Sequence, residues 1–369
     1  MENICVLHIV SALKGGGVER VLYNYFSHMN MENVKMSIAV LGENEKQFMA
    51  TLFLDLNIDI VYLSSDICMA MRRLNSILKK KEYNIVHCHV EELSVFYLYV
   101  AWINKVPVRI AHGHMAHTPL SITKILKKTL LYFVLNVFVT QRFACGKEAA
   151  KSLWGNRALS KGKVLVLNNA IDKNIFKFDM SVRLKKRHEL NIEDNTLVVG
   201  SVGRFAIQKN QKFLIDIFYE IRKKRKNALL LLVGEGTLEC KLKQQVAALG
   251  LVNSVLFLGL RNDVPELMQA MDLFLLPSLY EGLPVVGVEA QCMGLLSFFS
   301  DSITDEMKLS DNSIFVSLKK SAFQWCEIIL KYYDEGKERS SGCIDASFDI
   351  FKEADRLKSY YSGMLLKNE

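Results

Sequence analysis

The stretch PSLYEGLPVVGVEA holds two glutamates, Glu281 and Glu289, in otherwise apolar surroundings. An ionised carboxylate accepts two hydrogen bonds and therefore suits the vicinal hydroxyls of a sugar or a ribose. The preceding LFLLPS predicts a buried strand, and the proline after it fits the first turn of a helix. We expect free backbone N–H groups to face a phosphate or sugar oxygen in the turn formed by Gly282, Leu283, Pro284 and Val285. Alternatively, Glu281 only complements the helix dipole and Glu289 is a solvated helix residue.

Two cations, Arg204 and Lys209, follow the strand-like segment TLVVGSVG on a single loop. At the carboxyl edge of a strand and near a helix N-terminus, arginine can bind a diphosphate bidentately while lysine acts as a point charge. Alternatively, both are surface charges. The chain contains no D-x-D pair that could hold Mg²⁺ against a diphosphate. We therefore expect no metal cofactor and assign neutralisation of the phosphates to cationic side chains and N–H groups.

A glycine-rich turn, KGGGVERVL, follows the first strand-like segment and contains Gly15, Gly16 and Gly17. Backbone without side chains can approach a ligand closely, and the N-terminus of the following helix favours an anion. The turn is not a G-x-G-x-x-G fingerprint, so a dinucleotide site is not favoured. The alternative is a tight strand-to-helix turn without a ligand.

Histidines mark two further strand-like segments, IVHCHV and RIAHGHMAH. Strand alternation places His112 and His114 on the same side of their strand, at its carboxyl edge. H-x-H with another histidine, such as His87, His89 or His117, could form a zinc site. We favour the alternative that these histidines are a polar strand end lining a cleft.

Short apolar runs alternate with segments of helical periodicity along the whole chain, which predicts doubly wound parallel α/β sheets. The pattern restarts after about half of the 369 residues. We therefore expect two Rossmann-like domains facing an interdomain cleft, with ligands at the carboxyl ends of the strands. The expected boundaries are 1–172 for an acceptor domain, 173–345 for a nucleotide-sugar donor domain, and 346–369 for a terminal helix packing back toward the first domain. The polar, basic segment FKFDMSVRLKKRHELNIEDN (176–195) is interpreted as a linker region, and the two halves are expected to join near residues 172–190.

The composition limits the function classes. A net charge of +8 without dense basic clusters does not favour nucleic-acid binding. The eight cysteines form no C-x-x-C pair and suit buried thiols in a reducing compartment. The N-terminus lacks the basic region of a signal peptide, and no apolar run reaches the roughly 20 residues of a membrane-spanning helix. We expect a cytoplasmic protein, with possible peripheral membrane contact through the basic amphipathic segment 121–135; the alternative for that segment is a core-packing helix.

The chain resembles, nearly end to end, the GT-B-fold glycosyltransferases of family 4, especially bacterial enzymes of capsule, exopolysaccharide and O-antigen assembly. GGGVERVL, VHCHV, RIAHGH and VLNNAID are similar to N-terminal elements of that family. The Arg-Lys pair of GRFAIQKNQKF and the E-x7-E motif that ends in GVEA carry the more specific resemblance. Ala170 replaces the glycine that is usual in the "NGID" element, and S-D-S-I-T-D-E makes Glu306 a further candidate.

The resemblance implies a role for each candidate residue. Arg204 and Lys209 would bind the donor diphosphate, Glu281 the sugar hydroxyls, and Glu289 the ribose hydroxyls of a nucleotide. The Gly15–Gly17 loop would close over the diphosphate. One of His112 and His114 would lie beside the transferred sugar, and the sequence does not separate the two.

These inferences predict a retaining glycosyltransferase that moves a sugar from a nucleotide-diphosphate sugar, such as a UDP-sugar, to a lipid-linked oligosaccharide in surface polysaccharide synthesis. Retention is implied by the resemblance alone. One alternative is a GT-B-fold nucleotide-sugar epimerase. Another is a non-catalytic nucleotide-sugar-binding partner in an assembly complex. The sugar, the acceptor and the linkage do not follow from the sequence.

Overall fold

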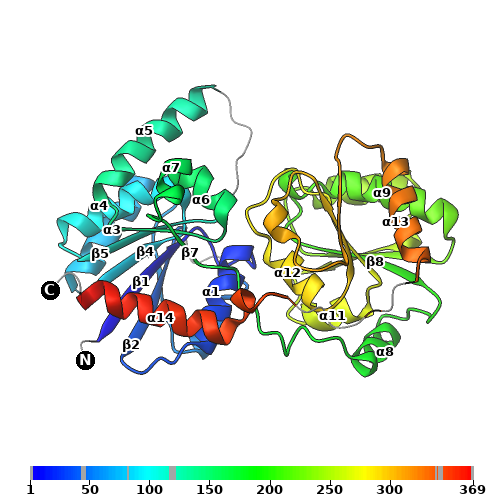
Figure 1. Cartoon of the computed structure of the whole chain (residues 1–369), viewed down its shortest axis with the longest axis horizontal. Helices are drawn as coiled ribbons and strands as arrows, with labels where there is room; N and C mark the ends of the chain where they lie inside the picture. The colour runs from blue at the N-terminus through cyan, green and yellow to red at the C-terminus, as the bar shows by residue number, and fades with distance from the viewer. Residues whose placement is uncertain are drawn as a thin grey trace. The chain divides into compact units, whose positions relative to one another are not determined.

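The computed structural model describes residues 3–42, 47–80, 83–115, 122–336, 339 and 344–366, with backbone only for 122–128. It divides into two compact units. Unit 1 comprises Met1–Ala170 and Ser347–Glu369, and unit 2 comprises Ile171–Ala346. Each unit is built on one parallel sheet with helices packed on it (Figure 1). The predicted fold class, two doubly wound α/β domains, is confirmed.

Unit 1 has strand order β3-β2-β1-β4-β5-β6-β7, so the order reverses between β1 and β4. Its strands are β1 (Ile4–Val10), β2 (Val34–Val40), β3 (Asp59–Tyr62), β4 (Ile85–Cys88), β5 (Val108–Gly113), β6 (Gln141–Ala144) and β7 (Leu165–Val166). Its helices are α1 (Gly17–His28), α2 (Ala50–Asp55), α3 (Ile67–Lys80), α4 (Ser94–Ile103), α5 (Ile122–Phe138), α6 (Lys147–Trp154), α7 (Asn156–Ser160) and α14 (Ile350–Leu366).

Unit 2 has strand order β10-β9-β8-β11-β12-β13, with the reversal between β8 and β11. Its strands are β8 (Leu197–Val202), β9 (Ala228–Val233), β10 (Val255–Gly259), β11 (Leu273–Leu276), β12 (Leu296–Ser300) and β13 (Ser313–Val316). Its helices are α8 (Met180–Glu189), α9 (Gln211–Lys224), α10 (Glu239–Ala248), α11 (Val264–Ala270), α12 (Val285–Cys292) and α13 (Ala322–Asp334).

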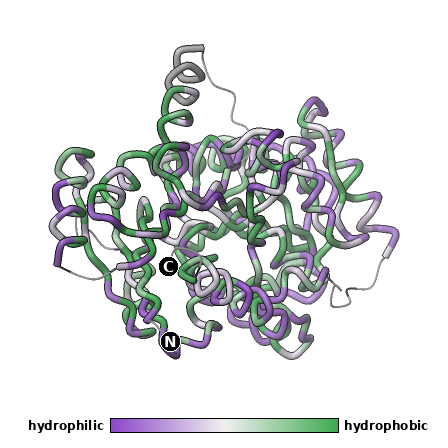
Figure 2. Tube along the Cα trace, turned by 60° about the vertical axis from the view of Figure 1, so that its left-hand side comes forward, coloured by the Kyte–Doolittle hydropathy of each residue, from purple (hydrophilic) through white to green (hydrophobic). Residues whose placement is uncertain are grey.

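The central strands are buried on both faces, which explains why apolar and polar residues do not alternate along them. Every residue of β8 and β11 is buried, because helices cover both faces of a doubly wound sheet. In Figure 2 much of the hydrophobic colour lies in the interior of the trace, and much of the hydrophilic colour lies on its outer turns. The apolar runs of the sequence are therefore the two cores.

The segment interpreted as a linker is largely a helix, and that interpretation is wrong. Asp179 begins α8 by accepting hydrogen bonds from the backbone N–H groups of Ser181 and Val182. The Arg187 guanidinium is buried and donates to several carbonyl groups and to Asp272, whose carboxylate also accepts from Val198 N at 2.7 Å. Although α8 is polar in composition, it is a helix, and buried charge-assisted hydrogen bonds anchor it to the sheet.

The last helix of the chain belongs to unit 1. Residues 347–369 group with this unit, and α14 lies against α1 in it (Figure 1). Tyr361 of α14 is fully buried, and its hydroxyl lies 2.7 Å from His87 Nδ1. Unit 1 is therefore closed by residues from both ends of the sequence.

Candidate functional site

The loops after β8 and β11 lie at the strand-order reversal of unit 2, the position where doubly wound sheets bind ligands. Hydrogen bonds join the two loops. Leu279 N donates to Gln208 O at 2.8 Å, and Gln208 Nε2 donates to Tyr280 O at 3.0 Å. Asn210 Nδ2 donates to Pro277 O at 3.0 Å. The sequence-predicted residues on these loops are thus brought together, and Gln208 and Asn210 are partners that the sequence interpretation missed.

Lys209, which is partly buried, and the buried Glu281 form an ion pair at the junction of these loops, with Nζ 2.7 Å from Oε1. Glu281 is only 6% exposed. Gln208 Nε2 donates to the other carboxylate oxygen at 3.2 Å, so each oxygen of the carboxylate has a partner. The carboxylate is therefore fixed in place. The alternative that Lys209 is a surface charge is wrong.

Arg204 differs from Lys209 in being solvent-exposed at the end of the same loop. Its backbone carbonyl accepts a hydrogen bond from Gln211 Nε2 at 2.9 Å, which fixes the backbone while the guanidinium stays accessible. A guanidinium in this position can bind a phosphate group through two parallel hydrogen bonds.

The turn after β11 leads into α12 one residue later than the sequence suggested. Pro284 is the N-cap rather than a first-turn residue, and the helix starts at Val285. Gly282, Leu283, Pro284 and Val285 are all buried. Glu289 is 3% exposed, so the alternative that it is a solvated helix residue is wrong. A buried carboxylate needs partners, so its position calls for a structural or ligand contact.

Glu306 lies on the segment that follows β12, where Thr304 Oγ1 accepts from its backbone N–H at 3.2 Å. Gln291 of α12 ties this segment down. Its Nε2 donates to Met307 O at 2.8 Å, and its Oε1 accepts from Leu309 N at 3.0 Å. The loops after β8, β11 and β12 are thus linked at one edge of the sheet.

Two glycines behind the cation-bearing loop are needed for close backbone packing. A Cβ on Gly234 would collide with the carbonyl of Gly203, and one on Gly236 would lie 2.7 Å from Phe205 N. Gly234 also has φ +130°. The segment VGEG therefore supports the loop that carries Arg204 and Lys209, a role that the sequence interpretation missed.

We expect Gly234→Ala to lower the free energy of unfolding of unit 2 by about 2–4 kcal/mol, because it adds a backbone clash to an unfavourable φ. Gly250→Ala is the matched control. Gly250 has φ +70° but no atom within 4 Å of an added Cβ, so strain alone should cost about 1 kcal/mol. Denaturant unfolding of both variants measures the difference. Equal losses would contradict the packing role.

In unit 1 the glycine turn precedes α1. Gly15 has φ +86°, Gly16 is the N-cap, and no atom lies within 4 Å of a Cβ added to Gly17. The buried Glu19 carboxylate packs against Gly16. It places a negative charge beside the helix N-terminus that was expected to attract phosphate. The sequence interpretation did not foresee this carboxylate.

Five histidines gather where β1, β4 and β5 end, and all five have lowered pKa values. Burial lowers the pKa of His8 and His114 to about 3. Burial, reinforced by neighbouring imidazoles, holds the pKa values of His87, His89 and His112 well below the usual range. The rings are therefore neutral at physiological pH.

The two histidines that the sequence left unseparated differ in exposure. His112 is 2% exposed, whereas His114 is partly exposed. His117 lies outside the described residues. Two triplets could offer nitrogens to a metal ion, with ligand atoms within 4.8 Å of one another, and these are His8, His87, His89 and His89, His112, His114. Within both triplets, nitrogens already lie at hydrogen-bonding distance from histidine neighbours.

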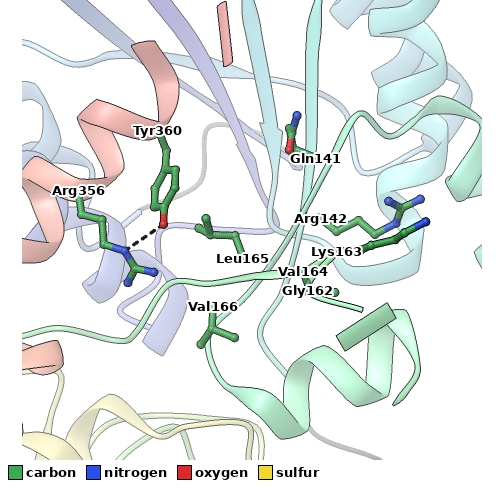
Figure 3. Close-up of a pocket in the computed structure, with 9 residues that line it drawn as sticks. All are labelled: Gln141, Arg142, Gly162, Lys163, Val164, Leu165, Val166, Arg356 and Tyr360. Carbon is green, nitrogen blue, oxygen red and sulfur yellow. Dashed lines mark hydrogen bonds between the residues drawn. The ribbon is translucent and has the colours of Figure 1, made fainter. Parts of the chain in front are cut away.

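A separate pocket of about 310 Å³ lies in unit 1. Figure 3 shows Arg356 and Tyr360 of α14 on one side of it, and Arg142 and Lys163 on the other. Gln141 is the first residue of β6, so the pocket lies toward the amino ends of the strands. That is the opposite edge from the glycine turn and the histidines. The remaining lining residues are Gly162, Val164, Leu165 and Val166.

Comparison with known proteins identifies the class. The family model described as "Glycosyl transferases group 1" matches residues 182–313. The chain is 28% identical to the Bacillus subtilis protein EpsF, named as a glycosyltransferase, over 90% of this chain and 89% of that protein. It is 24% identical to the capsular polysaccharide biosynthesis glycosyltransferase CapH of Staphylococcus aureus, over 98% and 100%.

The chain is also 27% identical to the UDP-Gal:alpha-D-GlcNAc-diphosphoundecaprenol alpha-1,3-galactosyltransferase of Escherichia coli, over 79% of each chain. Among solved structures, Anabaena HepE in complex with UDP and glucose has a TM-score of 0.79 at 20% identity, over 97% of this chain and 99% of that one. These findings confirm the predicted enzyme class and fold. The chain is a glycosyltransferase with a GT-B fold, it contains a group 1 glycosyltransferase domain, and it is similar to enzymes of bacterial polysaccharide biosynthesis.

Proposed function

We propose that the protein is a retaining glycosyltransferase that transfers a sugar from a UDP-sugar to a lipid-linked saccharide. The observation that carries the proposal is the Lys209–Glu281 pair on two joined loops, with Arg204 exposed beside it. The pair combines a cation for a diphosphate with a carboxylate for sugar hydroxyls. The UDP complex of HepE and the diphosphoundecaprenol acceptor named for the E. coli relative support the choice of donor and acceptor.

Each candidate residue has a proposed role. Arg204 and Lys209 neutralise the diphosphate, and Glu281 accepts hydrogen bonds from the sugar hydroxyls. Glu289 holds the ribose hydroxyls. In unit 1, the Gly15–Gly17 turn contacts the diphosphate, and a histidine lies beside the transferred sugar. Further N–H contacts come from the turn Gly282, Leu283, Pro284 and Val285.

The chemistry follows from these roles. Charge grows on the departing diphosphate as the glycosidic bond breaks, and fixed cations stabilise that charge without reorganisation. No metal is required, because the cations and N–H groups supply the charge complement. The acceptor hydroxyl attacks on the face that the diphosphate leaves, and the leaving phosphate takes its proton. This route retains the configuration of the sugar.

A labelled-donor assay tests the proposal. The purified protein is incubated with a panel of labelled UDP-sugars and a membrane extract. We expect label to move into the lipid fraction, and the anomeric coupling of the product to match that of the donor. A new free nucleotide sugar would instead indicate an epimerase, and donor binding without turnover would indicate a non-catalytic partner. An inverted product would contradict retention alone.

We also propose that unit 1 contacts an anionic membrane surface through an apolar patch on α4 and α5. No helix in the part of the chain that the structure describes has the length and hydropathy to cross a bilayer. Phe133 and Val137 are 65% and 70% exposed, and the described turns of α5 show hydrophobic colours in Figure 2. The ring centroids of Trp102 on α4 and Phe138 on α5 lie 5.5 Å apart, so the two helices form one surface. The other exposed members are Tyr99, Ile103, Leu130 and Val134.

The positive charge near the apolar patch favours an anionic membrane as its binding partner. The same helix carries Lys124, Lys127 and Lys128 in its first turns, and the chain has a net charge of +8. Basic residues next to an exposed apolar face favour the interface of an anionic bilayer over a neutral one. A lipid-linked acceptor would be reached from that position.

We expect the double variant Phe133→Ser, Val137→Ser to bind anionic vesicles about tenfold more weakly, because it removes apolar area that enters the interface. Co-sedimentation with phosphatidylglycerol vesicles measures the change. The matched control is Phe323→Ser, Val252→Ser, which alters two comparably exposed residues in unit 2. Equal binding by both variants, or an effect only on oligomeric state, would contradict the membrane proposal.

A further inference from the structure

The five clustered histidines of unit 1 are connected by hydrogen-bonding contacts into two separate rows. In the first row, His8 Nδ1 lies 3.0 Å from His89 Nε2, and His89 Nδ1 lies 2.9 Å from His114 Nε2. In the second, the Tyr361 hydroxyl lies 2.7 Å from His87 Nδ1, and His87 Nε2 lies 3.2 Å from His112 Nδ1. Each row ends at one of the two histidines that the sequence left unseparated.

A neutral imidazole has one N–H and one bare nitrogen, so each contact in a row needs a donor on one ring and an acceptor on the next. If His89 carries its proton on Nε2, it donates to His8 Nδ1 and must accept at Nδ1 from His114 Nε2–H. If the proton is on Nδ1, both contacts reverse. His8, His89 and His114 therefore take the same tautomer, and a change at one ring requires a change at all three.

The rows differ in what they reach. His112 is buried, and its Nε2 has no hydrogen-bond partner among the described residues. His114 is partly exposed at the carboxyl end of β5, and its Nδ1 takes no hydrogen bond from any described part of the chain. Glu91 Oε1 accepts from His114 N at 2.6 Å and fixes the backbone there. Only the first row thus ends in a ring nitrogen, His114 Nδ1, that lies at the carboxyl edge of the sheet and is available to a ligand.

We propose that His8 and His89 are positioning residues that fix the tautomer of His114, and that His114 rather than His112 contacts the transferred sugar through Nδ1. The sugar contact rests on the proposed function, whereas the tautomer coupling does not. The second row, from Tyr361 to His112, is an internal link between α14 and the sheet.

The coupling matters because the wrong tautomer exchanges a hydrogen-bond donor for an acceptor. His114 and its ligand group would then be two donors or two acceptors, and they could not form a hydrogen bond. Losing one such hydrogen bond costs about tenfold in rate when the bond forms in the transition state. The core end of the row at His8 is packed against Phe26 with ring centroids 4.8 Å apart, so the row is held by packing where it starts.

Nitrogen-15 NMR of histidine-labelled, EDTA-treated protein tests the coupling directly, because protonated and bare ring nitrogens have well-separated shifts. We expect His8, His89 and His114 to show one common tautomer in the unsubstituted protein. His8→Phe should let His114 exchange between tautomers, and His8→Asn, whose amide can restore the contact to His89, should reverse that change. Tyr361→Phe is the control, and it should shift His87 and His112 but not His114.

Different tautomers within the first row of the unsubstituted protein would overturn the proposal, and this measurement needs no variant to fold. A stoichiometric zinc ion in protein purified without chelator would also overturn it, because a metal bound by these nitrogens would replace the hydrogen bonds between them.

Activity then tests the sugar contact. We expect His8→Phe to lower kcat about tenfold with the donor KM unchanged within twofold, and His8→Asn to recover most of the loss. An altered His114 tautomer with unchanged kcat would overturn the role of His114 at the sugar and leave the coupling intact. Absence of transfer in the unsubstituted protein would instead count against the proposed function.

Discussion

Between pH 6.5 and 5.5, unit 1 should lose about 5 kcal/mol of its free energy of unfolding. Four buried histidines and the partly exposed His114 have folded-state pKa values far below the unfolded value of 6.5. Below pH 6.5 the unfolded chain therefore binds protons that the folded unit does not, and stability falls by about 1 kcal/mol per histidine over this first pH unit, approaching about 1.4 kcal/mol per pH unit below it. The contribution is fully present above pH 6.5, and it is lost progressively down to the lowered pKa values.

A loss of this size rivals the whole stability of a domain, which is commonly 5–15 kcal/mol. Unit 2 provides the internal control, because His188 is the one histidine between residues 171 and 346. Hydrogen exchange followed by mass spectrometry at pH 7.0 and 5.5, corrected for intrinsic rates, measures both units in one sample. Equal destabilisation of the two units, or none in unit 1, would show that the histidines are accessible to protons in the folded state.

Lys209→Ala should weaken UDP binding at least about 100-fold. The substitution removes the cation assigned to the diphosphate and also leaves Glu281 as a buried, unpaired carboxylate. Breaking one partner of a buried ion pair costs about 3–5 kcal/mol. Isothermal titration with UDP measures the loss. Unchanged affinity would contradict the assignment of Lys209 to the diphosphate.

Two controls separate charge from folding. Lys223→Ala removes an exposed lysine of α9 that pairs with Glu220, and it should leave UDP affinity unchanged. Glu281→Gln keeps the shape of the carboxylate and its contact to Gln208 but removes its charge. It should reduce discrimination among sugars more than affinity for UDP itself. Equal effects of Glu281→Gln on UDP and UDP-sugar binding would indicate a purely structural pair.

Much of the fold follows from the sequence, because buried parallel strands are short, continuous apolar runs. ALLLLVGEG and DLFLLPS each contain a strand of the structure, and MSIAVL covers most of β2. The helix α8 escaped prediction because its stability comes from Arg187, whose guanidinium finds its partners 83 to 85 positions along the chain as well as nearby. No local pattern reveals such partners.

The candidate site was predictable in its residue types but not in its pairing. Arg204, Lys209 and the two glutamates were identified from spacing and resemblance, whereas the contact between Lys209 and Glu281 depends on β8 and β11 being neighbours. The sequence contained only a weak indication that these histidines contact one another. His8 interrupts the apolar run ICVLHIV, and histidines also mark the ends of two other strand-like segments. Which histidines contact one another depends on the order of the strands in the sheet, and the sequence alone does not show that order.

The placement of α14 in unit 1 has a consequence for synthesis of the chain. Multidomain proteins often fold from the N-terminus as they leave the ribosome. Unit 2 is one continuous stretch, so its core is complete once residue 346 has emerged. Unit 1 begins first yet still lacks Tyr361, the partner of His87, until the last residues appear. Of the two units, the one that is translated first is therefore the one that finishes folding last.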